Sequence, residues 1–246
     1  MGAYQSNKTS RIVLVLGSAP AATASRDWPR LPFTDIVAIN NAWAVRPDWD
    51  FLIHPDDFPA ARRPVNLTED QRIVTSHDYV PVQNRYGGFV YADGTMAFTA
   101  GYWALGALRP SVLAFFGCDM VYPDAGPTHF YGTGAADPLR PDVTLRDLAA
   151  KSARLGIWAA RQGCHAVNLS TDDTRLTLPR ANAGDLHDLA RTRPIYDAKL
   201  FEQAEAAESE LAYMVPSGRY WEAQSSFDPA ALARIDAIWR GTLDAA

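Results

Sequence analysis

The sequence predicts an α/β fold, with a doubly wound, mostly parallel, Rossmann-like sheet and a helical appendage at the C-terminus. Two observations indicate it. Short apolar runs alternate with helical or loop segments, and several runs are continuously apolar, as expected of strands covered on both faces. After about residue 180 the sequence becomes polar and helical. We therefore expect an α/β domain over residues 1–180 and a helical extension packed on it over residues 181–246.

Each expected strand is a short apolar run rich in branched or aromatic residues. In chain order these strands cover residues 11–17, 35–40, 49–54, 71–76, 111–117 and 165–170. A nearly all-apolar stretch over residues 94–110 stops at a proline and predicts a helix buried against the sheet. Residues 144–163 space their apolar side chains three and four apart, with Thr144 as the expected N-cap, and predict an amphipathic helix.

The last helix is expected to begin with Asp228 as its cap and Pro229 in the first helical position. Its apolar side chains form one stripe, made of Leu232, Ile235, Trp239 and Leu243. A stripe of this kind docks on the body of the protein or on a second subunit. The sequence therefore leaves open whether the protein forms a homo-oligomer.

Composition and charge exclude several classes of protein. The chain carries a formal net charge of −5 with 48% apolar residues, which argues for a globular core and against non-specific binding to nucleic acid or anionic membranes. No run approaches the ~20 apolar residues of a membrane span, and the polar N-terminus has no apolar signal core. We expect a cytoplasmic protein. Cys118 and Cys164 lie in or beside apolar runs and are expected to be reduced and buried.

Polar residues directly follow five of the expected strands, where an open α/β sheet binds its ligands. These strand ends are residues 17–20, 40–43, 54–57, 117–120 and 170–173. The first of them, Gly17-Ser18-Ala19-Pro20, has one glycine and no following lysine, so it is neither a dinucleotide motif nor a P-loop. A single tight turn at a helix N-terminus suits one phosphate or the sugar of a mononucleotide.

A long loop over residues 127–142 is the second candidate region. It contains His129, Tyr131 and Thr133 among glycines. Long loops in compact domains are usually functional or mobile, and a histidine can act as a general base near neutral pH. The alternative is a surface histidine with no catalytic role.

Several blocks together resemble a known family. The blocks "LVLGSAPA", "VAINNAW", "GTMAFTAGYWALGAL" leading into "SVLAFFGCDM", "HFYGTG" and "HAVNLS" come in the order and spacing of the family 42 bacterial sialyltransferases. A related group that includes the archaeal hydroxymethylpterin diphosphokinases shares the early blocks. The resemblance covers roughly residues 11–172. It implies a sialyltransferase-like variant of the GT-A fold and transfer from a nucleotide-activated sugar, with CMP as the family's nucleotide.

The resemblance also implies a set of site residues. The expected nucleotide pocket consists of Gly17, Ser18, Ala19, Pro20, Asn40, Asn41, Asp56, Gly94, Thr95, Gly117 and Asp119. Tyr122 matches the tyrosine that steadies the leaving phosphate in the family. The family's catalytic base falls at Thr133, and a threonine cannot act as a base at neutral pH. We therefore expect His129 to do the acid–base work, with Tyr131 and Thr133 beside it in the catalytic loop.

No metal or other cofactor is expected for a transferase of this type, and its partners would be a nucleotide-sugar donor and a glycan or small-molecule acceptor. Asp48 and Asp50 match a DxD motif but precede a strand, so we interpret them as structural. One alternative is a Mg²⁺-dependent pyrophosphokinase of the pterin kinase type, with the metal on Asp56, Asp119 or Asp172. Another is a non-catalytic nucleotide-binding module whose helical tail binds a partner.

Overall fold

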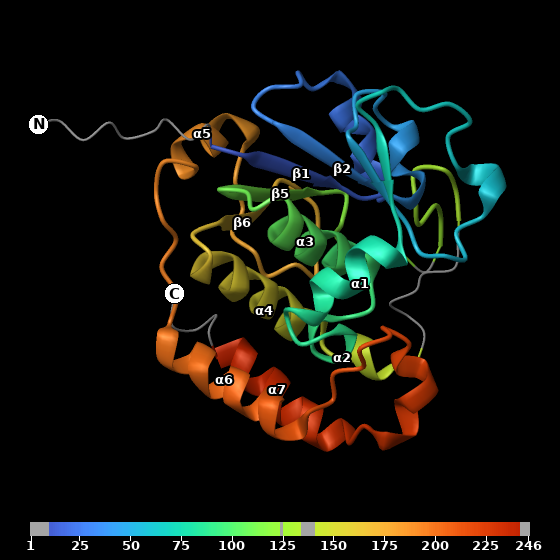
Figure 1. Ribbon diagram of the computed structural model, residues 1–246. Coiled ribbons are helices and arrows are strands. Elements are labelled where there is room, and N and C mark those ends of the chain that lie inside the picture. The colour runs from blue at the N-terminus through green and yellow to red at the C-terminus, as the bar shows by residue number, and fades with distance from the viewer. Residues whose placement is uncertain (1–9, 124, 134–140, 242–246) are drawn as a thin grey trace, which may run out of the picture.

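The computed structural model describes residues 10–123, 125–133 and 141–241, and it confirms the α/β class. Six parallel strands form one sheet in the order β4-β3-β2-β1-β5-β6, with helices on both faces (Figure 1). The strands are β1 (Ile12–Leu16), β2 (Asp35–Ile39), β3 (Phe51–Ile53), β4 (Arg72–Val74), β5 (Val112–Phe116) and β6 (His165–Asn168). Each lies inside an expected strand.

The order of the strands creates one switch point. From β1 the chain builds β2, β3 and β4 outward on one side, then returns to place β5 and β6 on the other side of β1. The loops that leave β1 and β5 therefore diverge at the carboxyl ends of these two strands. In an open parallel sheet this divergence opens a crevice for a ligand.

Long helices cover one face of the sheet. They are α1 (Ser76–Asn84), α3 (Met96–Ala107) and α4 (Leu148–Arg161), with the short α2 (Phe89–Ala92) beside them. Nearly every residue in the first three turns of α3 is buried, as its apolar sequence predicts. The expected N-cap Thr144 is wrong, because Asp147 caps α4 by accepting from the Ala150 N–H at 3.0 Å, while Thr144 belongs to a separate 3-10 turn.

Short helices cover the opposite face. They are η1 (Pro20–Asp27), η2 (Asn40–Ala44) and α5 (Leu186–Leu189), and their apolar side chains join the outer face of β1, β2 and β5 in one core cluster. The helix expected at Pro20 is present as a 3-10 helix. The hydroxyls of Thr23 and Ser25 donate to carbonyls three residues earlier, which competes with the α-helical hydrogen-bond pattern.

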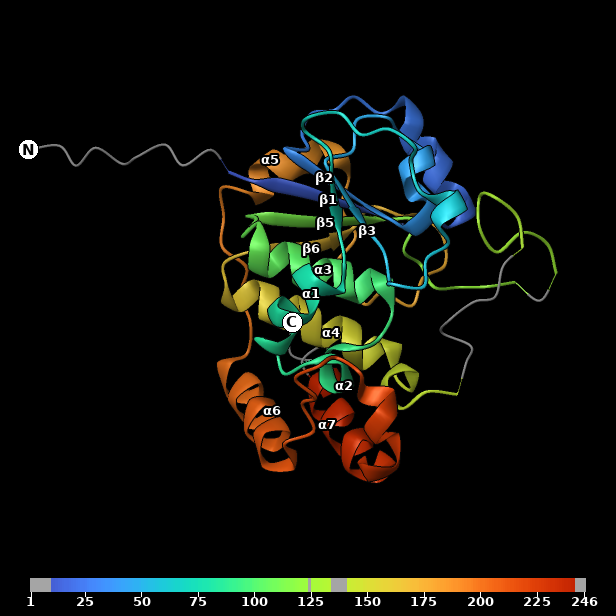
Figure 2. The same ribbon diagram turned by 45° about the vertical axis from the view of Figure 1, so that its right-hand side comes forward.

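The part of the C-terminal extension that follows α5 forms a third layer. It contains α6 (Ala198–Leu211), η7 (Tyr220–Ser226) and α7 (Pro229–Gly241), and α6 and α7 lie on the side of α4 that faces away from the sheet (Figures 1 and 2). The stripe residues Leu232, Ile235 and Trp239 are buried in the same core cluster as α3 and α4, whereas Leu243 lies outside the described residues. The stripe therefore docks on the body of the protein.

Two buried ion pairs join this extension to α4. Arg154 Nη2 lies 2.7 Å from Glu208 Oε2, and Lys151 Nζ lies 2.9 Å from Asp236 Oδ1. The Trp239 indole also donates to Glu208, at 2.8 Å. Both cations lie in α4 and both carboxylates lie in the extension. The buried charges of each part are therefore paired only when the two parts are packed together.

Cys118 and Cys164 are free and buried, as expected. Within residues 10–241, apart from the gaps at 124 and 134–140, every helix is too short or too polar to span a bilayer. The N-terminal residues on which the cytoplasmic expectation rests lie mostly outside the described residues.

Candidate functional site

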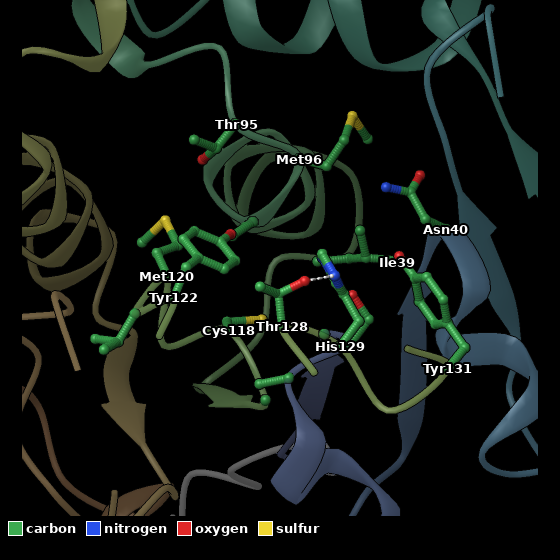
Figure 3. Close-up of a pocket in the computed structure, with 16 residues that line it drawn as sticks. Ile39, Asn40, Thr95, Met96, Cys118, Met120, Tyr122, Thr128, His129 and Tyr131 are labelled. Atoms are coloured by element: carbon green, nitrogen blue, oxygen red, sulfur yellow. Dashed lines mark hydrogen bonds between the residues drawn. The ribbon is translucent and has the colours of Figure 1, made fainter. Parts of the chain in front are cut away.

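A cavity of about 240 Å³ opens at the switch point (Figure 3). The ends of β1, β2 and β5, the first turn of α3 and the loop around residue 129 all contribute to its walls. The lining residues are Gly17, Ser18, Ala19, Ile39, Asn40, Thr95, Met96, Ala97, Gly117, Cys118, Met120, Val121, Tyr122, Thr128, His129 and Tyr131. Nine of these were expected at the site from the sequence: Gly17, Ser18, Ala19, Asn40, Thr95, Gly117, Tyr122, His129 and Tyr131.

Two glycines form the floor of the cavity. A Cβ on Gly17 would stand 2.1 Å from the carbonyl oxygen of Gly117, and Gly117 itself has a φ of +67°. The backbone N–H of Gly17 donates to Phe116 at 2.8 Å and that of Ala19 donates to Gly117 at 3.0 Å. These two N–H groups are satisfied within the protein, so the glycine of the first loop serves the close contact of β1 with β5.

Asn40 follows β2 and presents its side chain to the cavity. Its φ of 51° is left-handed, a conformation that asparagine tolerates better than most residues. Among the described residues, nothing hydrogen-bonds to its buried Oδ1. A buried acceptor without a partner is costly, so a ligand hydroxyl or amine at this point would be stabilised.

The loop carrying His129 is fixed to the floor. The Phe130 N–H donates to the Ser18 carbonyl at 3.0 Å, and His129 and Gly132 exchange two backbone hydrogen bonds, each 3.0 Å long. The His129 ring stacks on Tyr131 with centroids 4.9 Å apart. The loop residues 134–140, part of the region expected to be functional, lie outside the described residues.

Burial favours the neutral form of His129. The ring is half-buried, and this desolvation lowers the pKa of His129 below its ordinary value. Its Nδ1 lies 2.8 Å from the hydroxyl of Thr128. A neutral imidazole near pH 7 can accept a proton, which is the requirement for a general base.

Three residues expected in the nucleotide pocket lie outside the cavity, and the structure shows where each of them is placed. Pro20 is exposed at the start of η1. Asp56 is exposed and accepts from the Ser76 hydroxyl at 2.7 Å. Gly94 is packed against the extension, since a Cβ there would stand 2.6 Å from the Tyr220 hydroxyl. Their roles in binding stay predictions.

Three more expected residues do not line the cavity either. Asn41 lies one position beyond the lining, within η2. Asp119 is 5% exposed and is absent from the lining of the cavity; no partner of its buried Oδ1 is found in the described chain. Thr133 is exposed, and its hydroxyl donates to the Gly126 carbonyl at 3.1 Å. Among the described residues, the side-chain hydrogen-bond partner of the His129 ring is Thr128, and no hydrogen bond joins Thr133 to His129.

Sequence reasoning missed seven lining residues. They are Ile39, Met96, Ala97, Cys118, Met120, Val121 and Thr128. Each lies within two positions of an expected site residue, so proximity along the chain was the available signal. Most are apolar, and they give the cavity a mixed lining of apolar, hydroxyl and amide groups.

Sequence reasoning also missed Asp93, which precedes the first turn of α3. It is fully buried with a φ of 86°, and its Oδ1 accepts from the backbone N–H of Thr95. Desolvation raises the pKa of Asp93 to about 7. Asp93 thus fixes the turn that brings Thr95 to the cavity.

The two aspartates of the DxD match form ion pairs with arginines. Asp48 pairs with Arg46 at 2.8 Å and Asp50 with Arg30 at 2.6 Å, which agrees with their interpretation as structural. In the part of the chain that the structure describes, no three histidine, cysteine, aspartate or glutamate side chains gather as a metal-ligand set would.

Comparison of the chain with protein-family models, with curated proteins and with solved structures gives no match. The resemblance to the family 42 sialyltransferases therefore stays an expectation drawn from the sequence blocks.

Proposed function

We propose that this protein is a glycosyltransferase that binds a nucleotide-activated sugar, with a CMP-sugar as the first candidate, in the cavity between β1 and β5. One observation carries the proposal: the half-buried His129, whose pKa is lowered by burial, faces the same cavity as the strand-end residues Ser18 and Asn40. Its volume of about 240 Å³ is just below the ~300–1,000 Å³ of typical small-molecule sites. It suits a mononucleotide with the sugar at the open mouth.

Each of four cavity residues would have a separate role in the transfer. Asn40 Oδ1 would accept a hydrogen bond from a hydroxyl or amine of the donor, and the Ser18 hydroxyl would contact its phosphate or ribose. His129 would take the proton of the acceptor hydroxyl while that oxygen bonds to the sugar carbon. The bond from this carbon to the nucleotide phosphate would break, and the nucleotide would leave with the electron pair, steadied by Tyr122.

A thermal-shift panel tests the nucleotide assignment. CMP, CDP, UDP, GDP, ADP and ATP are added separately, each with Mg²⁺ and with EDTA. A ligand at about 100 times its Kd adds about 2.7 kcal/mol to the free energy of unfolding, which raises the melting temperature visibly. A metal-independent response to CMP supports the proposal and justifies turnover assays with CMP-sugars.

Variants place the response in the cavity. Asn40→Gly removes the unpaired amide without backbone strain, because glycine accepts a φ of 51°, and it is expected to weaken the CMP response. Asn66→Gly, at an exposed asparagine that does not line the cavity, is the matched control. A rise in melting temperature with ATP that requires Mg²⁺ would favour the pyrophosphokinase. If no nucleotide raised the melting temperature, the pocket assignment would be refuted.

A further inference from the structure

Thr128 is placed to control the chemistry of His129. Its side chain is 8% exposed, and its Oγ1 lies 2.8 Å from Nδ1 of the His129 ring (Figure 3). The ring is also confined on its faces, by Tyr131 at 4.9 Å and by Tyr122 at 5.9 Å between centroids. Rotation of the imidazole away from Thr128 is therefore restricted.

A neutral imidazole carries one proton, and the position of that proton decides what the ring can do. If Nδ1–H donates to Thr128 Oγ1, the lone pair lies on Nε2 and the ring can accept a proton there. If the Thr128 hydroxyl donates to Nδ1, the proton lies on Nε2 and the ring can only donate. The contact between Thr128 and His129 thus decides whether Nε2 can act as a base or serves only as a hydrogen-bond donor.

We propose that Thr128 is a positioning residue that accepts the Nδ1–H of His129 and so holds the lone pair of Nε2 free to act as the base. The catalytic part of this inference rests on the proposed function, in which His129 takes the proton of the acceptor hydroxyl. After that transfer the ring is an imidazolium, and Thr128 Oγ1 still accepts from Nδ1–H and stabilises it.

Nitrogen NMR tests the tautomer without any substrate. The protein is labelled with ¹⁵N-histidine, and His129→Gln identifies the His129 signals among the five histidines. At pH 8 we expect the Nδ1 signal in the protonated range and the Nε2 signal in the unprotonated range. Thr128→Val removes the hydroxyl at nearly constant shape and is expected to shift the His129 tautomer toward Nε2–H, and Thr128→Ser is expected to restore it.

His165 supplies a matched control, because its Nε2 lies 2.9 Å from the hydroxyl of Thr192. Thr192→Val is expected to move the His165 signals and leave those of His129 in place. A wild-type His129 protonated on Nε2, or an unchanged His129 spectrum in Thr128→Val, would overturn the proposal. The same spectra report whether each variant is folded.

Kinetics separate this inference from the proposed function. With a working donor, Thr128→Val is expected to lower kcat about tenfold or more, up to the ~10²–10⁴-fold that a general base contributes. KM should change little, and Thr128→Ser should recover most of kcat. Absence of turnover in the wild type would refute the function and leave the tautomer result standing. A normal kcat in Thr128→Val would refute the positioning role alone.

Discussion

Replacing Gly17 with alanine tests the close contact on which the cavity floor depends. The new Cβ would meet the Gly117 carbonyl oxygen at 2.1 Å and Cys118 Sγ at 2.7 Å. The carbonyl cannot turn away cheaply, because it accepts the Ala19 N–H at 3.0 Å. The strand ends must separate by roughly 1 Å, and overpacking of this kind costs about 1–3 kcal/mol or more.

The cost should lie at the upper end of that range, because β1 and β5 are buried along their whole length. The smaller entropy of the unfolded alanine chain offsets only about 0.4–1 kcal/mol. We expect a net loss of about 2 kcal/mol or more. For a chain of this size that corresponds to a fall in Tm of roughly 4–8 °C.

Urea unfolding followed by tryptophan fluorescence measures the loss of stability, and the nucleotide panel measures the loss of the cavity. Gly184→Ala is the matched control, because a Cβ there meets nothing within 4 Å. It should keep or slightly raise the free energy of unfolding. If Gly17→Ala were as stable as the wild type and responded equally to CMP, the argument that this glycine serves the β1–β5 contact would be wrong.

Three further predictions concern charged groups. Glu208→Ala leaves the fully buried Arg154 unpaired and should cost about 3–5 kcal/mol in urea unfolding, whereas Asp188→Ala, in an exposed pair, should cost under about 0.5 kcal/mol. Burial raises the pKa of Asp93 from 3.8 to about 7 in the folded protein. The folded state therefore holds this proton more tightly than the unfolded chain, and the free energy of unfolding should fall as pH rises between these two values. Asp93→Asn, which cannot ionise, should gain on the wild type over that window in unfolding measured from pH 4 to 8. Because the pKa of His129 is lowered, the acid limb of a kcat/KM profile should fall below pH 6.5 and vanish in His129→Gln.

The sheet could be predicted because each strand is a short apolar run that can be recognised from its own residues. A run such as residues 12–16 is short, apolar at every position and buried at every position, as expected of a central parallel strand. The cover of the opposite face was harder to predict. There η1 depends on side-chain hydroxyls that bond back to the main chain, and this competition is invisible in a hydrophobic pattern.

The candidate site was predictable where it follows from topology and unpredictable where it follows from distant contacts. Parallel strands end at one edge, so the residues after β1, β2 and β5 had to converge. Gly94, by contrast, does not line the cavity and packs on Tyr220, which lies far along the sequence. No local pattern indicates that contact.

That contact gives the extension a part in shaping the cavity. Tyr220 donates to Asp142 at 2.8 Å and stands against Gly94, one residue before Thr95 caps α3. The first turn of α3 in turn forms one wall of the cavity. On the other side of the extension, the buried cations of α4 find their carboxylates in α6 and α7. A buried charge without a partner is strongly destabilising, and the extension supplies the carboxylates that pair with the two buried cations of α4. The same extension packs against the turn that begins α3, and the first turn of α3 forms the cavity wall.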